Sequence, residues 1–516
     1  MNKIEEFVDK HVNKIFIVIL ILFAILLLYK IGIIPKGLHV DEAGMAFDAI
    51  SLITNGTDRY SNQLPVYLVN FGGGQSALYA YLTSILVGIF GFSISIIRIP
   101  SVVITLISSI ALYKLVKENV GKKEALVISF IYAIVPFNIM KSRWALDAYL
   151  LAPMLIISLY AFIHATIKCQ YRYFIIAGIL FGLTLYTYAI SYIIIPIVLI
   201  LLLIYYLFIK EIDFKQILVF GIPLFLMALP LILMVGYNSE IIPKIDLPLF
   251  KIPELWWYRG AEVNLSNINK NINGIFEIIF VKDFLDYNAI EQFGTVYFIS
   301  IPFVIFGLVF SLGDMINSIK KKEKNLDIVF IILAIVIFIV SLCLEEVNIN
   351  KINAIYIPII YFISKGIWFL CNRFKKTYII IFLIYLIELI MFLNYYFGDF
   401  ADKKLYLFEE NILYAIEFAE TLEKENIYVE PALNQTYIYT VLASKITTEE
   451  FSKTYKLDEY YRVKEYGNYK FYLPNEINAD SVFIIKNNEN YINVLKENGF
   501  TEEVFEEFKV LYLEEK

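Results

Sequence analysis

Long apolar runs separated by short polar segments fill the chain up to residue 397. A helix needs about 20 apolar residues to cross a hydrocarbon core of about 30 Å. We therefore predict eleven membrane-spanning helices, at residues 14–34, 95–116, 124–141, 148–167, 173–189, 191–209, 217–236, 293–313, 326–344, 354–371 and 377–397. A further run at residues 77–90 is only 14 residues long, and this length predicts an interfacial or re-entrant helix.

Basic residues are distributed unevenly over the connecting segments. With the N-terminus in the cytoplasm, the inner segments carry 18 Lys and Arg in 54 residues, and the outer segments carry 10 in 139. Cytoplasmic segments of membrane proteins show this excess of basic residues. We therefore expect a multi-pass protein of the cell membrane with two long outer loops, residues 35–94 and 237–292. If residues 77–90 formed a full span, the later connecting segments would change sides, and the basic residues that follow it would lie outside the cytoplasm.

The pattern changes after residue 397. Helix-like stretches alternate with strand-like ones, the former at Asn411–Glu425 and Tyr491–Asn498, the latter at Tyr437–Ala443, Tyr469–Leu473 and Ser481–Ile485. This alternation predicts a small α/β domain at residues 398–516, after a membrane domain at residues 1–397. The number of predicted spans places the α/β domain outside the cytoplasm.

Composition narrows the class of protein. Of the 516 residues, 59% are apolar and 18% are charged, whereas soluble domains have about 45–50% apolar and about 25% charged residues. This excludes a soluble enzyme. Residues 398–516 carry a net charge of −11, whose field repels phosphates, so no nucleic-acid partner is expected. Three cysteines and three histidines form neither a disulfide framework nor a zinc pattern.

Two adjacent carboxylates, Asp41 and Glu42, follow the outer end of the first predicted span. A carboxylate at this edge of the membrane can act as a general base towards a hydroxyl group. The alternative is a solvated acidic pair at a helix N-terminus, where the helix dipole favours negative charge.

Two further polar clusters lie in predicted outer segments. In the first, Arg143 and Asp147 are four residues apart, so on a helix they would share a face. In one interpretation, Arg143 is a cation that binds a phosphate and Asp147 is a second carboxylate of the site. In the other, the two residues form a structural ion pair. The second cluster runs from Asn348 to Asn353 and contains Lys351, which provides either a cation for an anionic headgroup or a snorkelling lysine in a polar turn.

The first outer loop also carries a family resemblance. After Asp41-Glu42 come four further segments in order: Asp58–Tyr67, Gly72–Leu82, Phe90-Gly91 and Ile97–Ser101, the last containing Arg-x-Pro-Ser. This order resembles the dolichyl-phosphate-mannose–protein mannosyltransferase-like membrane glycosyltransferases of the GT-C fold. Aminoarabinose lipid A transferases and oligosaccharyltransferases are more distant relatives. The resemblance is strongest over residues 35–190, weaker to residue 397, and absent beyond it.

The resemblance implies an all-α polytopic membrane protein that moves a sugar from a polyprenyl-phosphate donor to an extracytoplasmic hydroxyl group, with inversion. The acceptor is a protein, a lipid or an envelope glycan. Asp41 matches the general base, Glu42 its common neighbour, and Asp147 a second acidic position. In the implied mechanism Arg143 and Lys351 contact the donor phosphate. The stretch from Asn350 to Asn353 resembles a late outer loop of the family, which often has Arg where this chain has Lys351. We expect five loop positions to line the cavity: Pro65, Tyr67, Gln75, Asn350 and Asn353.

Some distant relatives bind a divalent metal with such acids and others do not, so a metal is possible and no metal ligand is assigned. The main alternative function is a transporter or flippase for lipid-linked sugars, and another is a scaffold for the acidic tail. Transporters carry internal repeats and charges near the membrane midplane. Here the notable charges cluster at the predicted outer edge, which favours the enzyme.

Overall fold

The computed structural model describes residues 2–245, 250–256, 263–374, 377–431, 435–444, 446–460 and 462–514. It comprises two compact units. The helical unit consists of Met1–Ile31, Arg98–Val235 and Arg259–Asp402. The mixed unit consists of Gly32–Ile97, Gly236–Tyr258 and Lys403–Lys516.

All eleven predicted spans are helical over most of their length. The helices are α1 (Asn2–Leu28), α4 (Ile94–Asn119), α5 (Lys122–Ile134), α6 (Pro136–Lys141), α7 (Leu151–Lys168), α8 (Tyr171–Leu185), α9 (Ser191–Phe208), α10 (Phe214–Asn238), α13 (Ser300–Lys321), α14 (Leu326–Leu342), α16 (Tyr356–Arg373) and α17 (Thr377–Phe397). Within the described residues, eight helical segments are long and apolar enough to cross a membrane. The apolar helices α8 and α14 are shorter. The chain is therefore a multi-pass membrane protein.

Short helices occupy the connections: η1 (Asp147–Leu150), η2 (Leu265–Asn267), α11 (Ile268–Asn271), α12 (Ile275–Phe280), α15 (Ile349–Ile352) and η3 (Asn353–Ile355).

Local backbone chemistry explains where the helices depart from the predicted ranges. The third predicted span is divided between α5 and α6 because Pro136 has no N–H to continue the ladder, and Val135 before it is extended. The eighth begins at Ser300 instead of residue 293, because Gly294 takes a positive φ of 67° and donates its N–H back to Ile290. The first predicted span, residues 14–34, belongs to helix α1, which ends at Leu28.

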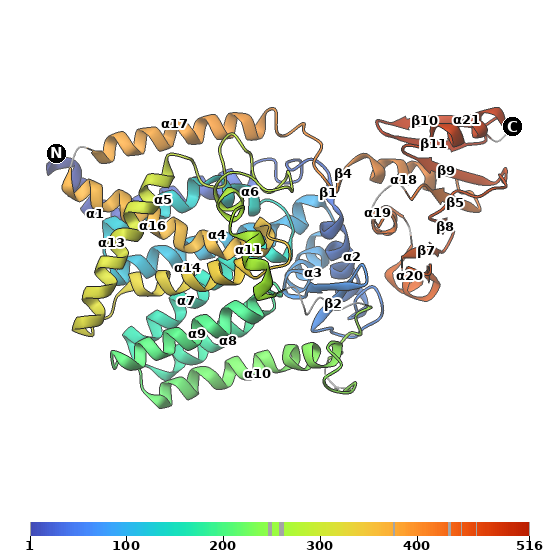
Figure 1. Ribbon diagram of the computed structural model, residues 1–516. Coiled ribbons are helices and arrows are strands. Elements are labelled where there is room, and N and C mark those ends of the chain that lie inside the picture. Colours follow the sequence, from blue (N-terminus) through green and yellow to red (C-terminus); the bar gives the residue numbers. More distant parts are fainter. Residues whose placement is uncertain are drawn as a thin grey trace. The chain divides into compact units, whose positions relative to one another are not determined.

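Helix α16 lies at the centre of the helical unit. It packs against α5, α13, α14 and α17 (Figure 1). Two glycines allow the backbones of α13 and α16 to approach closely. A Cβ on Gly307 would lie 1.8 Å from the carbonyl oxygen of Phe362, and a Cβ on Gly366 would lie 2.2 Å from that of Phe303. Small residues provide this close contact between membrane helices.

The first predicted outer loop forms part of the mixed unit. It contains α2 (Val40–Asn55), a hairpin of β2 (Tyr67–Asn70) and β3 (Gly73–Ser76), and α3 (Leu78–Phe90). Helix α2 packs against α3. The helix predicted at residues 77–90 is thus confirmed as a helix.

The mixed helix and strand content predicted for residues 398–516 is also confirmed, whereas the domain boundary at residue 397 stays a prediction. The mixed sheet of these residues has the strand order β10 (Thr501–Phe505), β11 (Phe508–Tyr512), β9 (Ser481–Ile485), β5 (Asn426–Val429), β8 (Tyr469–Lys470), β7 (Val463–Tyr466) and β6 (Lys456–Leu457). Strand β5 runs parallel to β8 and β9, and the other neighbours are antiparallel. The helices are α18 (Asn411–Thr421), α19 (Tyr437–Ala443), α20 (Thr448–Thr454) and α21 (Glu489–Glu497).

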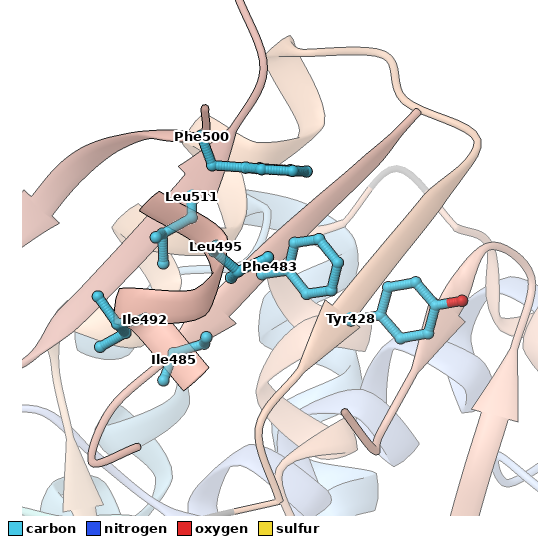
Figure 2. Close-up of a cluster of buried hydrophobic side chains, with 7 residues drawn as sticks. All are labelled: Tyr428, Phe483, Ile485, Ile492, Leu495, Phe500 and Leu511. Carbon is cyan, nitrogen blue, oxygen red and sulfur yellow. The ribbon is translucent and has the colours of Figure 1, made fainter. Parts of the chain in front are cut away.

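An apolar cluster attaches α21 to this sheet (Figure 2). Ile492 and Leu495 of the helix are completely buried with Phe483 and Ile485 of β9 and Leu511 of β11. Tyr428 stacks on Phe483 at a ring-centroid distance of 5.3 Å.

The strand predicted at Tyr437–Ala443 is wrong, because this segment is helix α19. Its aromatic and β-branched residues favour strands by propensity. However, five consecutive side chains, Tyr437 to Val441, are buried, and a short segment buried on all sides carries no periodicity that distinguishes helix from strand. The strand predicted at Tyr469–Leu473 is formed only at its first two residues.

A two-stranded ladder joins the first loop to the tail within the mixed unit. Strand β1 (Leu38–His39) pairs antiparallel with β4 (Phe408–Glu409). The N–H of Val40 donates to the carbonyl of Leu407, which extends the ladder to the start of α2.

Candidate functional site

Asp41 and Glu42 lie in the first turn of α2, where their environments differ. Glu42 is completely buried, and its Oε2 accepts the backbone N–H of His39 at 3.0 Å. The imidazole Nδ1 of His39 in turn accepts the N–H of Asp41 at 3.1 Å. These reciprocal contacts cap the helix. The side chain of Asp41 remains 32% exposed, so of the two acids it is the one that a substrate can reach.

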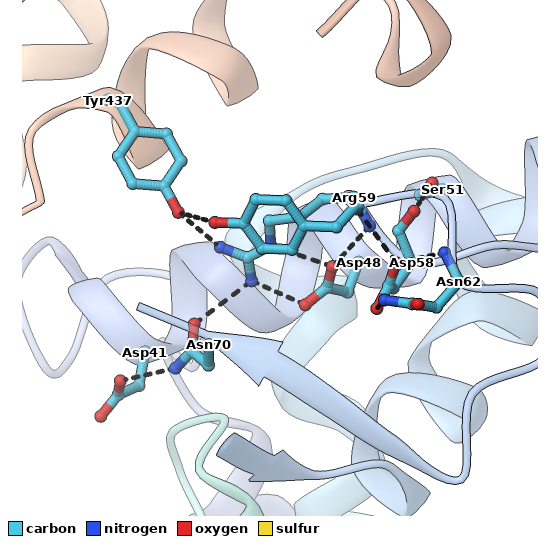
Figure 3. Close-up of polar contacts among 9 residues, drawn as sticks. Asp41, Asp48, Ser51, Asp58, Arg59, Asn62, Asn70 and Tyr437 are labelled. Carbon is cyan, nitrogen blue, oxygen red and sulfur yellow. Dashed lines mark hydrogen bonds and ion pairs between the residues drawn. The ribbon is translucent and has the colours of Figure 1, made fainter. Parts of the chain in front are cut away.

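Asn70, at the end of β2, holds the Asp41 carboxylate. Its Nδ2 donates to Asp41 Oδ1 at 3.1 Å, and its Oδ1 accepts from Arg59 Nη2 at 3.3 Å (Figure 3). An amide has a donor end and an acceptor end, so the guanidinium fixes which end faces Asp41.

Arg59 is itself held by Asp48 of α2. The guanidinium donates from Nε to Asp48 Oδ1 at 2.9 Å and from Nη2 to Oδ2 at 2.6 Å, and the backbone N–H of Arg59 adds a third bond. Both side chains are completely buried. A two-point guanidinium–carboxylate contact defines both geometry and charge.

Sequence reasoning did not identify Asp48, Arg59 or Asn70 as site residues. One local signal was present: Asp48 follows Asp41 by seven residues, which places both on one face of an α-helix. Gly44 lies between them, and a Cβ there would come within 2.7 Å of Asn70 Oδ1 and 2.8 Å of Arg59 Nη2. The glycine leaves the space that the amide and the guanidinium occupy.

Asp58 is a second buried acid in this loop. It accepts hydrogen bonds from the backbone N–H groups of Tyr60 and Asn62 and from Asn62 Nδ2, at 3.0, 2.8 and 2.8 Å. Burial, and secondly the negative charge of Asp48, raise the pKa of Asp58 to about 7.

Residues of the tail reach this cluster within the mixed unit. The hydroxyl group of Tyr437, on α19, accepts from Arg59 Nη1 at 3.2 Å and lies 3.2 Å from the hydroxyl group of Tyr60 (Figure 3). The hydroxyl group of Tyr439 donates to the carbonyl of Leu38 at 3.2 Å.

The predicted loop residues Pro65, Tyr67 and Gln75 lie in or beside the hairpin. The ring of Tyr67 covers Gly74, where a Cβ would lie 2.0 Å from the ring. Gln75 is buried and pairs with Leu68 across the hairpin. Because side chains alternate along a strand, Leu68 and Asn70 lie on the same face, and so does Gln75. Pro65 contributes its carbonyl, which accepts the hydroxyl proton of Tyr81.

In the helical unit, Arg143 binds the end of α1. Its Nη1 donates to the carbonyls of Leu26 and Leu27, both at 2.8 Å, and its Nη2 donates to the carbonyl of Tyr29 at 2.6 Å. A helix C-terminus leaves its last carbonyls without intrahelical partners, and a cation there also meets the negative end of the dipole.

Arg143 and Asp147 do not share a helix face, so this expectation is wrong. Helix α6 ends at Lys141, and the next helical residue is Asp147, which begins η1. Asp147 is buried, and its Oδ1 accepts the N–H of Ala148 at 2.9 Å.

In the helical unit, the two residues that follow Asp147 contact the second polar cluster. The hydroxyl group of Tyr149 donates to Asn350 Oδ1, and Asn353 Nδ2 donates to the carbonyl of Ala148 at 2.9 Å. Lys351 is half-buried on α15, where its N–H donates to Asn348 Oδ1 at 3.0 Å.

Residues from the second predicted outer loop complete this cluster, and sequence reasoning did not identify them. Lys141 is buried, and its Nζ donates to Asn288 Oδ1 at 2.6 Å and to the carbonyl of Tyr287 at 3.0 Å. Asp283 Oδ2 accepts from Asn288 Nδ2 at 2.6 Å and from the N–H of Ile349 at 2.7 Å. In the sequence, the signal for these residues is a polar run, residues 282–292, just before the span predicted at 293–313.

The predicted site residues therefore form two groups. Asp41, Glu42, Pro65, Tyr67 and Gln75 belong to the mixed unit, whereas the others, Arg143, Asp147, Asn350, Lys351 and Asn353, belong to the helical unit. The proximity of Asp41 to Arg143 and Asp147 stays a prediction. Among the described residues, no group of three His, Cys, Asp or Glu side chains could hold a metal ion.

Comparisons with known proteins fit this architecture. Residues 75–236 match the family described as dolichyl-phosphate-mannose-protein mannosyltransferase. ArnT from Cupriavidus metallidurans in the apo state is similar in structure, with a TM-score of 0.58 at 12% identity, covering 96% of this chain and 97% of that one. The same protein bound to undecaprenyl phosphate gives a TM-score of 0.56 with the same identity and coverage.

The Archaeoglobus fulgidus oligosaccharyltransferase in its apo form gives a TM-score of 0.48 at 13% identity, covering 84% of this chain. The present chain spans 63% of the length of that protein. No curated protein sequence matches this chain.

These findings show the fold: the chain has the GT-C fold, which membrane glycosyltransferases also have. Over residues 75–236 it is similar to the protein mannosyltransferase family.

Proposed function

We propose that the protein is a membrane glycosyltransferase that moves a sugar from a polyprenyl-phosphate donor to an acceptor hydroxyl group. The hydroxyl group belongs to an extracytoplasmic protein, lipid or envelope glycan. The match to mannosyltransferases and the fold shared with ArnT, which has been seen with undecaprenyl phosphate, support this class. The proposal includes a cytoplasmic N-terminus and an extracytoplasmic tail, as the distribution of basic residues predicts.

The observation that carries the proposal is the state of Asp41. Its carboxylate is partly exposed, whereas Glu42 beside it is buried and bonded to the backbone of His39. The Asp41 carboxylate accepts a hydrogen bond from Asn70, whose amide is oriented by the buried ion pair of Arg59 and Asp48. A carboxylate held in one geometry and open on one side suits a general base.

In the proposed reaction, the acceptor oxygen attacks the anomeric carbon of the donor on the face opposite the phosphate. The new glycosidic bond forms as the bond from carbon to phosphate oxygen breaks, and the configuration inverts. The proton of the acceptor hydroxyl group passes to Asp41, and polyprenyl phosphate leaves. Because the leaving group is a phosphate, no strong general acid is needed.

Lys351 is proposed to contact the donor phosphate as a single cation. Asp147 is proposed to orient the acceptor. Arg143 remains a candidate for the phosphate, but its contacts with the carbonyls of α1 favour a structural role.

The test is Asp41→Asn in purified protein, assayed with radiolabelled undecaprenyl-phosphate mannose and an envelope extract as acceptor. We expect a loss of transfer by about 100- to 10,000-fold, the usual contribution of a general base. Asp480→Asn is the control, because that side chain is 57% exposed and lies in the same unit. Full activity of Asp41→Asn would remove Asp41 as the base. No transfer by the wild-type protein from the mannose, glucose or aminoarabinose donor would contradict the proposed donor class.

A further inference from the structure

Asn70 lies between an anion and a cation. Its amide nitrogen donates to Asp41 Oδ1, and its amide oxygen accepts from Arg59 Nη2. With the amide reversed, the NH₂ group would face the guanidinium, and the carbonyl would face the carboxylate. Both contacts would then be repulsive, so the neighbours allow one orientation only.

The cation that fixes this orientation cannot easily move. Arg59 makes two side-chain bonds to Asp48 and donates to Tyr437 as well, and no part of it reaches solvent. Gly44 provides the space in which its Nη2 and Asn70 Oδ1 meet. Asn70 therefore links the partly exposed carboxylate of Asp41 to a buried, immobile guanidinium.

The contacts of Asp41 distinguish its two oxygens. Oδ1 accepts from Asn70, whereas within the described part of the chain Oδ2 accepts no hydrogen bond and lies 3.7 Å from His39 Nδ1. Other titratable or charged groups near Asp41 include Glu42, Tyr439 and, beyond Asn70, Arg59.

We propose that Asn70 is a positioning residue that fixes the Asp41 carboxylate so that Oδ2 receives the proton of the acceptor hydroxyl group. This inference rests on the proposed function. Loss of the amide donor would leave the carboxylate free to rotate, and a misplacement of about 1 Å can cost about 100-fold in rate.

The test is Asn70→Asp, which keeps the shape and the acceptor for Arg59 but replaces the donor with a like charge. Asn62→Asp is the matched control, because Asn62 Nδ2 also donates to a carboxylate of this loop, that of Asp58, at 2.8 Å. Both variants are compared with the wild-type protein in kcat, in KM for undecaprenyl-phosphate mannose, and in Tm. We expect Asn70→Asp to lower kcat by about 10- to 100-fold with KM unchanged, and Asn62→Asp to retain kcat.

A second variant, Gly44→Ala, keeps every polar group and adds one methyl group where Asn70 Oδ1 and Arg59 Nη2 meet. If Asn70→Asp does not fold, Gly44→Ala tests the positioning role instead. We again expect kcat to fall with KM unchanged. Wild-type kcat in a folded Asn70→Asp, or in Gly44→Ala, would overturn the inference. An equal loss of kcat in Asn70→Asp and Asn62→Asp would do the same, because it would indicate a general structural effect.

Asp41→Asn separates this failure from failure of the proposed function. If Asp41→Asn is inactive while Asn70→Asp is fully active, only the positioning role is lost. If Asp41→Asn is active, the assignment of the base itself is wrong.

Discussion

Asp48 and Arg59 form a two-point ion pair in which neither side chain reaches solvent. The pair joins α2 to the loop that follows it. Its energetic value lies mainly in the cost of separating the partners, because a buried charge without a counter-ion is highly unfavourable.

We therefore predict that Asp48→Ala destabilises the protein by about 3–5 kcal/mol, since it leaves the Arg59 guanidinium buried without its carboxylate. Thermal or chemical unfolding in detergent measures the loss. Asp480→Ala, at an exposed position, should change stability by less than about 0.5 kcal/mol. Equal stabilities of the two variants would contradict the prediction.

Asp58 predicts a pH dependence of stability. Its pKa is about 7 in the folded protein, above the ordinary value of 3.8, so the folded state binds a proton that the unfolded state has already released. Stability from this group is fully present below about pH 4 and is lost as the pH rises through about 7. Because each pKa unit corresponds to about 1.4 kcal/mol, the loss amounts to a few kcal/mol at most.

Asp58→Asn removes this dependence. The difference in Tm between the variant and the wild-type protein should therefore shift in favour of the variant between pH 5 and pH 8. The same difference at both pH values would show that Asp58 does not titrate in this range.

Arg143→Gln tests whether this residue serves the helix end or the donor. Because three hydrogen bonds to the carbonyls of Leu26, Leu27 and Tyr29 are lost, we expect destabilisation by about 2–4 kcal/mol and an unchanged KM for undecaprenyl-phosphate mannose. The exposed Arg172 provides the control as Arg172→Gln, with little effect on either quantity. A raised KM with an unchanged Tm would instead support the phosphate role.

The apolar helices could be predicted from the sequence because the membrane signal is local: a run of about 20 apolar residues is sufficient. Two of the errors in the ranges arise at Pro136 and Gly294, where backbone chemistry interrupts the apolar pattern. Segment Tyr437–Ala443 was misassigned because its conformation depends on burial against other elements, which propensity does not record.

For the candidate site, the sequence indicated Asp41 but not the residues that hold it. Asp48, Arg59 and Asn70 acquire their roles through contacts made across α2, the following loop and β2. The partners of Arg143 were missed for a related reason. Spacing suggested Asp147, but the chain leaves the helix after Lys141 and the guanidinium reaches the end of α1 instead. Spacing predicts partners only where the backbone is known.

The ladder between β1 and β4 ends one residue before α2 begins and two before Asp41. A segment more than 360 residues downstream thus supplies half of the backbone pairing beside the proposed base. The tail is consequently not an interchangeable cassette: a tail transplanted from another protein would have to bring its own strand for Leu38–His39, or leave that stretch of main chain unpaired where the reaction is proposed to occur.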